Sequence, residues 1–230
     1  EKPLALTVAD GEKIVEAANE KGVILMVGHL LQYHPVFAHL RDSVLAGDYG
    51  KIRYAYSHRL SMGIFRTQED AFWSLAPHDI SMLIALFGEE PTEVRGSGLD
   101  FITEGIADEA RLDMVFSDGR RAHIFVSWLH PFKEQKLVIV AEEAMLVFDD
   151  TKPWAEKLAV YKHLVEMAER GPVPVKADVE YIDVPQGEPL GSECAHFIEC
   201  CKTGKKPYTD GEEALRVLRV LELPNTLPQA

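Results

Sequence analysis

Apolar and polar positions change their spacing near residue 50 of the chain. Before that point, "VADGEKIVEAANEKG" has helical spacing and ends at Gly22, which predicts a helix over residues 8–21. The next segment, "VILMV" (23–27), is apolar without alternation, which is typical of a strand buried on both faces of a parallel sheet. A second helix is predicted over residues 35–46. This order is that of an α/β unit.

After residue 50 the apolar positions alternate. "KIRYAYSHRL" (51–60) predicts a half-buried strand. "RLDMVFSDGRRAHIFVSW" (111–128) contains two alternating runs joined by Asp118-Gly119, a strong hairpin signal. "KLVIVAEEAMLVFDD" (136–150) contains two more runs around Glu142 and Glu143. The pattern predicts an antiparallel sheet of at least five or six strands between residues 51 and 185.

Helices are expected to interrupt and follow this sheet, over residues 76–88, 191–204 and 210–223. The fold class predicted from this order is α/β followed by α+β, with an open, mainly antiparallel sheet that carries its helices on one face. We therefore expect two domains, residues 1–48 and 49–230.

Composition excludes several classes of function. The net charge of −13 argues against a nucleic-acid-binding protein, which needs a basic surface. No apolar run reaches the ~20 residues of a membrane span, and no signal peptide is visible, so we expect a cytoplasmic protein. The three cysteines, Cys194, Cys200 and Cys201, are interpreted as reduced, buried thiols, because their spacing does not fit a zinc site. No metal is expected.

Histidines provide the first candidates for chemistry. His78 follows Pro77 in the first turn of a predicted helix, where the helix dipole favours a neutral imidazole that can act as a base. A capping or packing histidine explains the same position equally well. His29, Tyr33 and His34 follow the predicted buried strand, at the edge where ligands bind in open α/β sheets. An ordinary surface loop is the alternative.

Other short motifs give weaker signals. Lys2 precedes Pro3 at an expected strand exit, where its ammonium would lie over the carboxyl edge of the sheet, although most lysines are simply solvated. "GSGLDF" (96–101) lacks the third glycine of a dinucleotide fingerprint and follows the change to antiparallel strands. We therefore reject it as a cofactor site.

Taken together, "EKP" before a helix, an apolar run ending in "VGHLLQYHP", an antiparallel sheet and "APHDIS" form a series over the whole chain. In this series the chain resembles the glucose–fructose oxidoreductase/inositol dehydrogenase/MocA (Gfo/Idh/MocA) family of NAD(P)-dependent sugar oxidoreductases. The resemblance implies a Rossmann domain followed by a large open-sheet domain. It also implies that "EKP" lies about two thirds of the way through the Rossmann domain, so we expect the chain to be truncated before its GxGxxG turn.

The resemblance assigns roles to individual residues. Lys2 matches the family's catalytic lysine beside the nicotinamide, and Glu1 and Lys2 are expected at the cofactor, which is NAD or NADP. His78 matches the general base that takes the proton of the substrate hydroxyl, while Lys2 would stabilise the alkoxide. The family often has Asp four residues before this histidine, whereas this chain has Ser74. "Asn-x-Arg-Phe" is replaced by "LLQY" (30–33). These departures imply a different sugar pocket.

The segment "YAYSHRLSMGIFRTQEDAFWSLAPHDIS" is similar to the subgroup that acts on nucleotide-linked amino sugars, such as UDP-N-acetylglucosamine 3-dehydrogenases. Arg59 and Arg66 would suit a diphosphate and Trp73 a stacked ring, although surface arginines and a core tryptophan explain them as well. The residues expected to bind the substrate are His29, Tyr33, Arg59, Arg66, Trp73 and Asp79.

Two further expectations concern the chain as a whole. Without the GxGxxG turn it is expected to be inactive alone, and the alternative function is a cofactor-less binding or dimerisation module. A homo-oligomer is expected because apolar residues occupy both faces of one strand, with Ile124 and Val126 on one side and Phe125 on the other. The exposed face of the sheet would then join two copies.

Overall fold

A mixed sheet forms the centre of the chain, of which the computed structural model describes residues 1–222. Its strands are β1 (Ile52–Met62), β2 (Glu93–Leu99), β3 (Glu109–Val115), β4 (Arg121–Ser127), β5 (Leu129–Ala141), β6 (Met145–Asp149), β7 (Leu158–Tyr161) and β10 (Val179–Tyr181). They lie in the order β10-β7-β6-β5-β1-β4-β3-β2. Only β1 and β4 are parallel neighbours among these strands. Two further strands, β8 (Leu164–Ala168) and β9 (Gly171–Val175), pair only with each other.

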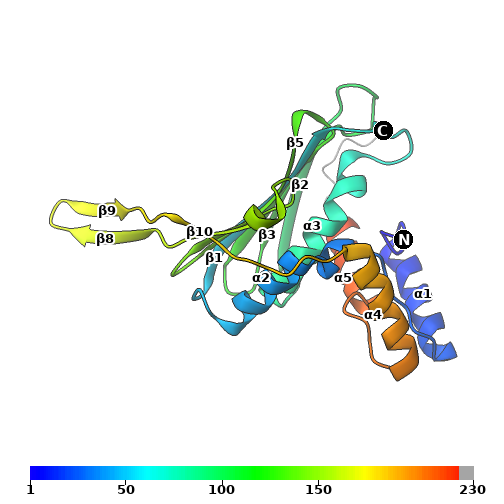
Figure 1. The fold of residues 1–230 in the computed structure, drawn as a ribbon. Helices are drawn as coiled ribbons and strands as arrows, with labels where there is room; N and C mark the ends of the chain where they lie inside the picture. Colours follow the sequence, from blue (N-terminus) through cyan, green and yellow to red (C-terminus); the bar gives the residue numbers. More distant parts are fainter. Residues whose placement is uncertain (223–230) are drawn as a thin grey trace.

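The helices lie on one side of this sheet (Figure 1). They are α1 (Val8–Lys21), α2 (Pro35–Ala46), α3 (Ala71–Phe87), α4 (Pro189–Thr203) and α5 (Gly211–Glu222), with short 3-10 turns η1 (Leu30–Tyr33) and η2 (Trp154–Glu156). Of these, α2 and α3 pack against the sheet, α5 packs on α3, and α1 packs on α5. Within residues 1–222, no helix combines the length and apolar composition needed to cross a membrane.

The hydrophobic core lies between α3 and the sheet. Ile80 and Leu83 of α3 are fully buried, as are the inward residues of β4 such as Ile124. Phe87 at the end of α3 stacks on Phe116 with ring centroids 3.9 Å apart. The predicted fold class, a largely antiparallel sheet with helices on one face, is therefore confirmed. The predicted hairpin at Asp118-Gly119 joins β3 to β4, and Gly119 adopts a positive φ of 83°.

Two predicted elements are wrong. Residues 23–27 do not form a sheet strand, because no described strand lies beside them; they make one isolated bridge, between Met26 and Asp210. The helix expected from residue 76 begins at Ala71. The Asp70 carboxylate caps its N-terminus by accepting a hydrogen bond from the Trp73 N–H at 2.8 Å. Pro77 consequently lies inside α3, and the first-turn argument for a neutral His78 does not hold.

Smaller differences concern the ends of the chain's elements. The last predicted helix extends to residue 223, which lies outside the described residues. Of the cysteines, Cys200 is buried, whereas Cys194 and Cys201 are exposed; all three are free thiols. The division into residues 1–48 and 49–230 stays a prediction.

The other face of the sheet is divided into an apolar and a polar half. Cross-strand pairs form two apolar rows over β1, β5, β6, β7 and β10. The first apolar row contains Tyr54, Val140, Met145, Tyr161 and Val179. The second contains Tyr56, Val138, Val147, Ala159 and Tyr181. Over β4, β3 and β2 both rows become mainly polar. The first row continues as Arg121, Val115 and Glu93, and the second continues as His123, Asp113 and Arg95. A register shift between Ile52 and Tyr54 gives Tyr54 this orientation, while Ile52 is buried.

Candidate functional site

His78 is a partly exposed histidine of α3 with one buried nitrogen that has no partner. Its Nδ1 makes no hydrogen bond within the described structure. Burial lowers the pKa of His78 well below its ordinary value of 6.5, and the positive charges of Arg59, Lys2 and, more weakly, His29 lower it further. The imidazole is therefore neutral at pH 7 and able to accept a proton.

Lys2 contacts the helix that carries His78. Its Nζ donates a hydrogen bond to the backbone carbonyl of Ser74, one helical turn before His78. Burial lowers the pKa of Lys2 below 10.5; the Glu69 carboxylate opposes this shift, while Arg66 and Arg59 add to it. The structure thus brings together two predicted catalytic residues that are separated by most of the first third of the chain.

Arg59 and Asp79 form a buried ion pair next to His78. Arg59 Nε is 2.7 Å from Asp79 Oδ2, and its Nη2 is 3.2 Å from Oδ1. Ser57 Oγ donates to the same Oδ1 at 2.5 Å. Asp79 is fully buried, so its contacts are with Arg59 and Ser57. This geometry gives Asp79 the role of holding Arg59 against α3, and its predicted contact with substrate remains untested.

A second buried cluster surrounds His29. Its Nδ1 lies 2.6 Å from Glu213 Oε2, and Ser81 Oγ donates to Glu213 Oε1 at 2.6 Å. Gln32 Nε2 donates to the hydroxyl and the carbonyl of Ser81, both at 2.9 Å. His29 is 1% exposed, so it joins η1 to α5 and α3 from inside the protein. Sequence reasoning missed Glu213; its signal was an acidic residue on the same helical face as the buried Val217.

Tyr33 belongs to a different set of contacts. Its hydroxyl lies 2.9 Å from Thr209 Oγ1, and its ring is 5.4 Å from that of His196. Burial raises the pKa of Tyr33 to about 12. His34 is also buried; it caps α2, because its Nδ1 accepts the Val36 N–H at 3.2 Å. Both residues link the loop after residue 27 to neighbouring elements.

Arg66 lies in the segment before α3, and Trp73 lies in the first turn of α3. Arg66 is half exposed and its Nε is 3.6 Å from Glu69 Oε1. Trp73 is partly buried and lines a cavity of about 360 Å³. The other residues around this cavity are Pro3, Leu6, Thr67, Gln68, Glu69, Asp70, Gly105 and Ile106. Glu1 is exposed at the chain's first position. The cavity therefore adjoins the Lys2–His78 pair through Pro3 and Trp73.

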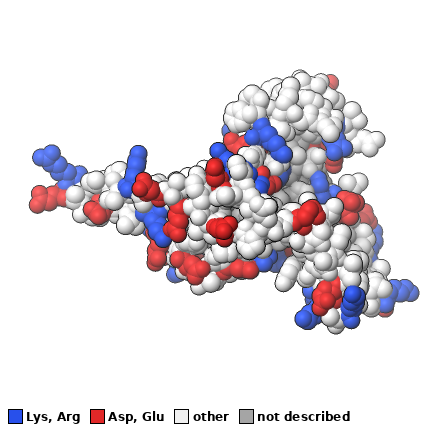
Figure 2. Space-filling model, viewed as in Figure 1, with Lys and Arg blue, Asp and Glu red and all other residues white. Residues whose placement is uncertain are grey.

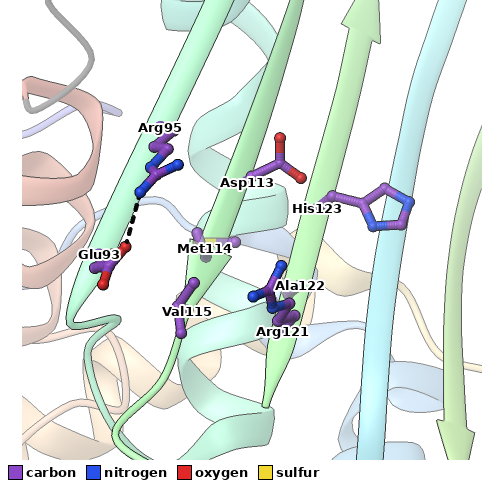
Figure 3. A pocket seen from close by; sticks show the side chains of 8 residues that line it. All are labelled: Glu93, Arg95, Asp113, Met114, Val115, Arg121, Ala122 and His123. Atoms are coloured by element: carbon purple, nitrogen blue, oxygen red, sulfur yellow. Dashed lines mark hydrogen bonds and ion pairs between the residues drawn. The ribbon is translucent and has the colours of Figure 1, made fainter. Parts of the chain in front are cut away.

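A separate hollow of about 340 Å³ lies on the polar half of the open sheet face (Figure 3). Figure 3 shows Arg95, Asp113 and His123 on neighbouring strands, with the ion pair of Arg95 to Glu93 at 3.4 Å. Burial lowers the pKa of His123, while Asp113 opposes the shift. Because Arg59 binds Asp79 of α3 and His78 belongs to α3, on the helical side of the sheet, this hollow is not part of their site. Among the described residues, no group of histidine, cysteine and acidic side chains could hold a metal ion.

A family model and several known proteins are similar to this chain. Residues 37–147 match the family model for the GFO/IDH/MocA C-terminal domain. The chain is 26% identical over 227 residues to UDP-N-acetylglucosamine 3-dehydrogenase of Acidithiobacillus ferrooxidans, covering 95% of this chain and 66% of that protein. It is 24% identical to scyllo-inositol 2-dehydrogenase (NAD(+)) of Bacillus subtilis, covering 96% of this chain and 65% of that protein.

The solved structures agree on the fold. A crystal structure of the Acidithiobacillus ferrooxidans enzyme superposes with a TM-score of 0.82 at 24% identity, covering 97% of this chain and 68% of that one. The chain thus spans slightly less than two thirds of the length of these curated relatives.

Proposed function

Because residues 37–147 match the GFO/IDH/MocA C-terminal domain, we propose that the protein containing this chain is an NAD(P)-dependent dehydrogenase that oxidises a sugar hydroxyl to a ketone. The observation that carries this proposal is a neutral histidine, His78, beside a lysine, Lys2, that is fixed to the same helix. A neutral imidazole can accept a hydroxyl proton, and a nearby ammonium can stabilise the negative charge that develops on the oxygen.

In this mechanism His78 accepts the proton of the substrate hydroxyl. Its lowered pKa keeps the imidazole available as an acceptor at neutral pH, and Arg59 and Lys2 contribute to that shift. The Lys2 ammonium stabilises the negative charge that develops on the oxygen. The bound dinucleotide supplies the acceptor for the hydride that leaves the same carbon. Glu1 and Lys2 would lie at the reacting end of the cofactor, whereas its phosphates would need a GxGxxG turn, which the 230-residue sequence does not contain.

For the substrate, we propose a UDP-linked amino sugar. The similarity to UDP-N-acetylglucosamine 3-dehydrogenase supports this choice. Arg66, half exposed near Lys2, suits a diphosphate, and Trp73 offers a ring face at the adjoining cavity. A cytoplasmic location stays a prediction.

The test is steady-state kinetics of the full-length protein that contains this chain, with UDP-N-acetylglucosamine and either cofactor. His78→Asn and Lys2→Met are each expected to lower kcat by about 100- to 10,000-fold, with a much smaller change in KM. His39→Asn, an exposed histidine on α2, serves as the matched control and should keep the wild-type kcat. Near-normal kcat in the His78 variant would remove it from the mechanism.

The alternative is a binding or dimerisation module that has lost its cofactor. Titration of the 230-residue chain with NADH, followed by fluorescence, tests this alternative, because a cofactor-less module should not bind NADH. We propose that the chain alone does not reduce NAD(P), because the phosphate-binding turn supplies much of the dinucleotide affinity. Steady-state turnover by the 230-residue chain would contradict this.

We further propose that the chain forms a homo-oligomer through the apolar rows of the open sheet face. These rows contain Tyr54 and Tyr181, which are 43% and 47% exposed. Monomeric proteins seldom leave a large continuous apolar patch in water, and a twofold contact between two such faces would bury it.

A further inference from the structure

Beyond the sheet, residues 164–175 form an arm that extends away from the rest of the molecule (Figure 1). Its two strands, β8 and β9, pair with each other and with no other described strand. Every residue of β8 is exposed, and so is every residue of β9 except Gly171. Figure 2 shows acidic and basic side chains at the far end of this arm, and behind them mostly uncharged surface interrupted by acidic atoms.

The base of the arm is built to a defined geometry. β7 and β10 pair up to Tyr161 and Val179, and β8 and β9 resume the pairing at Leu164 and Val175. Between these pairs, two residues on one strand (162–163) lie opposite three on the other (176–178), an irregularity like a β-bulge. His163 Nδ1 accepts the Ala177 N–H at 3.0 Å across this irregularity. The arm is thus a continuation of the β7–β10 ribbon, bent away from the sheet.

The two faces of the arm differ in chemistry. Directly paired residues share a face, so Val165, Met167, Pro172 and Pro174 lie together on one face, which we call the arm's apolar face. The opposite face contains Glu166 among Leu164, Val173 and Val175. Val165 is 67% exposed and Met167 is 80% exposed, so the apolar face has no cover within residues 1–222.

The two prolines also determine how the arm can bind. Ala168 and Gly171 flank a two-residue turn, so Pro172 and Pro174 occupy positions whose N–H groups would point away from β8. Proline has no N–H, and the free edge of β9 therefore lacks the donors that an added strand needs. A partner can therefore bind the arm through its apolar face, but not by adding a strand to the free edge of β9.

An isolated two-stranded hairpin is marginally stable in water and needs a hydrophobic face packed on something else. We infer that the arm's apolar face docks on a second copy of this chain. The four side chains of this face cover far less than the ~800 Å² per partner of a stable interface, so the partner must also be held elsewhere. The apolar rows reach β7 and β10 at the base of the arm, through Tyr161, Val179 and Tyr181. A second copy held there lies within reach of the arm.

This inference rests on the self-association proposed above, and the experiment separates the two. Sedimentation velocity of the 230-residue chain over a micromolar concentration range gives the dissociation constant of the dimer. Val165→Asp combined with Met167→Asp is expected to raise that constant about tenfold or more. Val173→Asp combined with Val175→Asp, the same change on the opposite face, is expected to leave it within about threefold.

Each outcome has one meaning. A monomeric wild-type chain at all concentrations would overturn the self-association and the docking of the arm together. A wild-type dimer that the Val165/Met167 variant leaves unchanged would overturn the docking alone, and an equal loss in the control would overturn the choice of face. Trypsin provides an independent readout at the Arg170–Gly171 bond of the turn. Cleavage there should slow as the dimer forms, and a rate independent of concentration would also overturn the docking.

Discussion

The guanidinium of Arg59 binds the carboxylate of Asp79 at two points, 2.7 and 3.2 Å, on the residue next to His78. Asp79 is 1% exposed and Arg59 12% exposed in their side chains. A charge buried in this way is tolerated only with its partner, so the pair fixes β1 to α3 at the candidate site. The position of Arg59, and with it part of the positive field around His78, depends on this carboxylate.

Removal of Arg59 should therefore destabilise the chain strongly. We expect Arg59→Ala to lower the free energy of unfolding by about 3–5 kcal/mol, because it leaves Asp79 charged and buried. Arg53→Ala, an exposed arginine of the same strand, should change it by less than about 0.5 kcal/mol. Urea denaturation at pH 7 measures both. An Arg59 variant as stable as the Arg53 control would show that Asp79 does not need this partner.

The lowered pKa of His78 predicts a dependence of stability on pH. The unfolded chain binds a proton at His78 near pH 6.5, whereas the folded chain does so only at lower pH, so stability falls as the pH drops below 6.5. One such group contributes a slope of at most about 1.4 kcal/mol per pH unit.

His78→Asn should remove this contribution, so that the slope of the unfolding free energy between pH 6.5 and 5 becomes shallower than in the wild type. Comparing the two chains cancels the effects of the other histidines. Identical slopes would mean that His78 has an ordinary pKa in the folded state.

Some elements of the fold follow from local sequence signals, and others depend on contacts between distant residues. Alternation and the Asp118-Gly119 turn are local signals, and they predicted the hairpin of β3 and β4. The run 23–27 was misread because apolar content alone does not say whether a neighbouring strand is present to pair with it. The helical spacing of apolar residues predicts a start of α3 near residue 76, yet the capping carboxylate of Asp70 places the start at Ala71. The Glu213–His29 contact spans most of the chain, and no local pattern encodes it.

The carboxylate of Asp150 should stabilise the fold at pH values above the pKa of this group. Burial alone would raise the pKa of this carboxyl, but hydrogen bonds from His34 and Lys157 outweigh it and lower the pKa from 3.8 to about 2. A lowered carboxyl pKa stabilises the fold above pH 3.8, and the contribution disappears as the pH falls towards 2.

Asp150→Asn is therefore expected to cost about 2 kcal/mol of unfolding free energy at pH 7 and much less at pH 2. Asp48→Asn, an exposed carboxyl in the turn after α2, is the matched control and should have little effect at either pH. A loss of stability in the Asp150 variant that is equal at both pH values would point to packing instead of charge.

The apolar rows of the sheet allow a direct test of self-association away from the arm. Tyr54 lies at one end of an apolar row, and its side chain is 43% exposed. Leu45 on α2, which is 58% exposed and lies outside the sheet, is the matched control. Tyr54→Glu places a charge where a second sheet face would have to exclude water, which costs several kcal/mol if the contact forms. We expect this variant to be monomeric by light scattering at micromolar concentration, while Leu45→Glu keeps the wild-type mass. Equal masses for the wild type and the Tyr54 variant would show that this face does not join the copies.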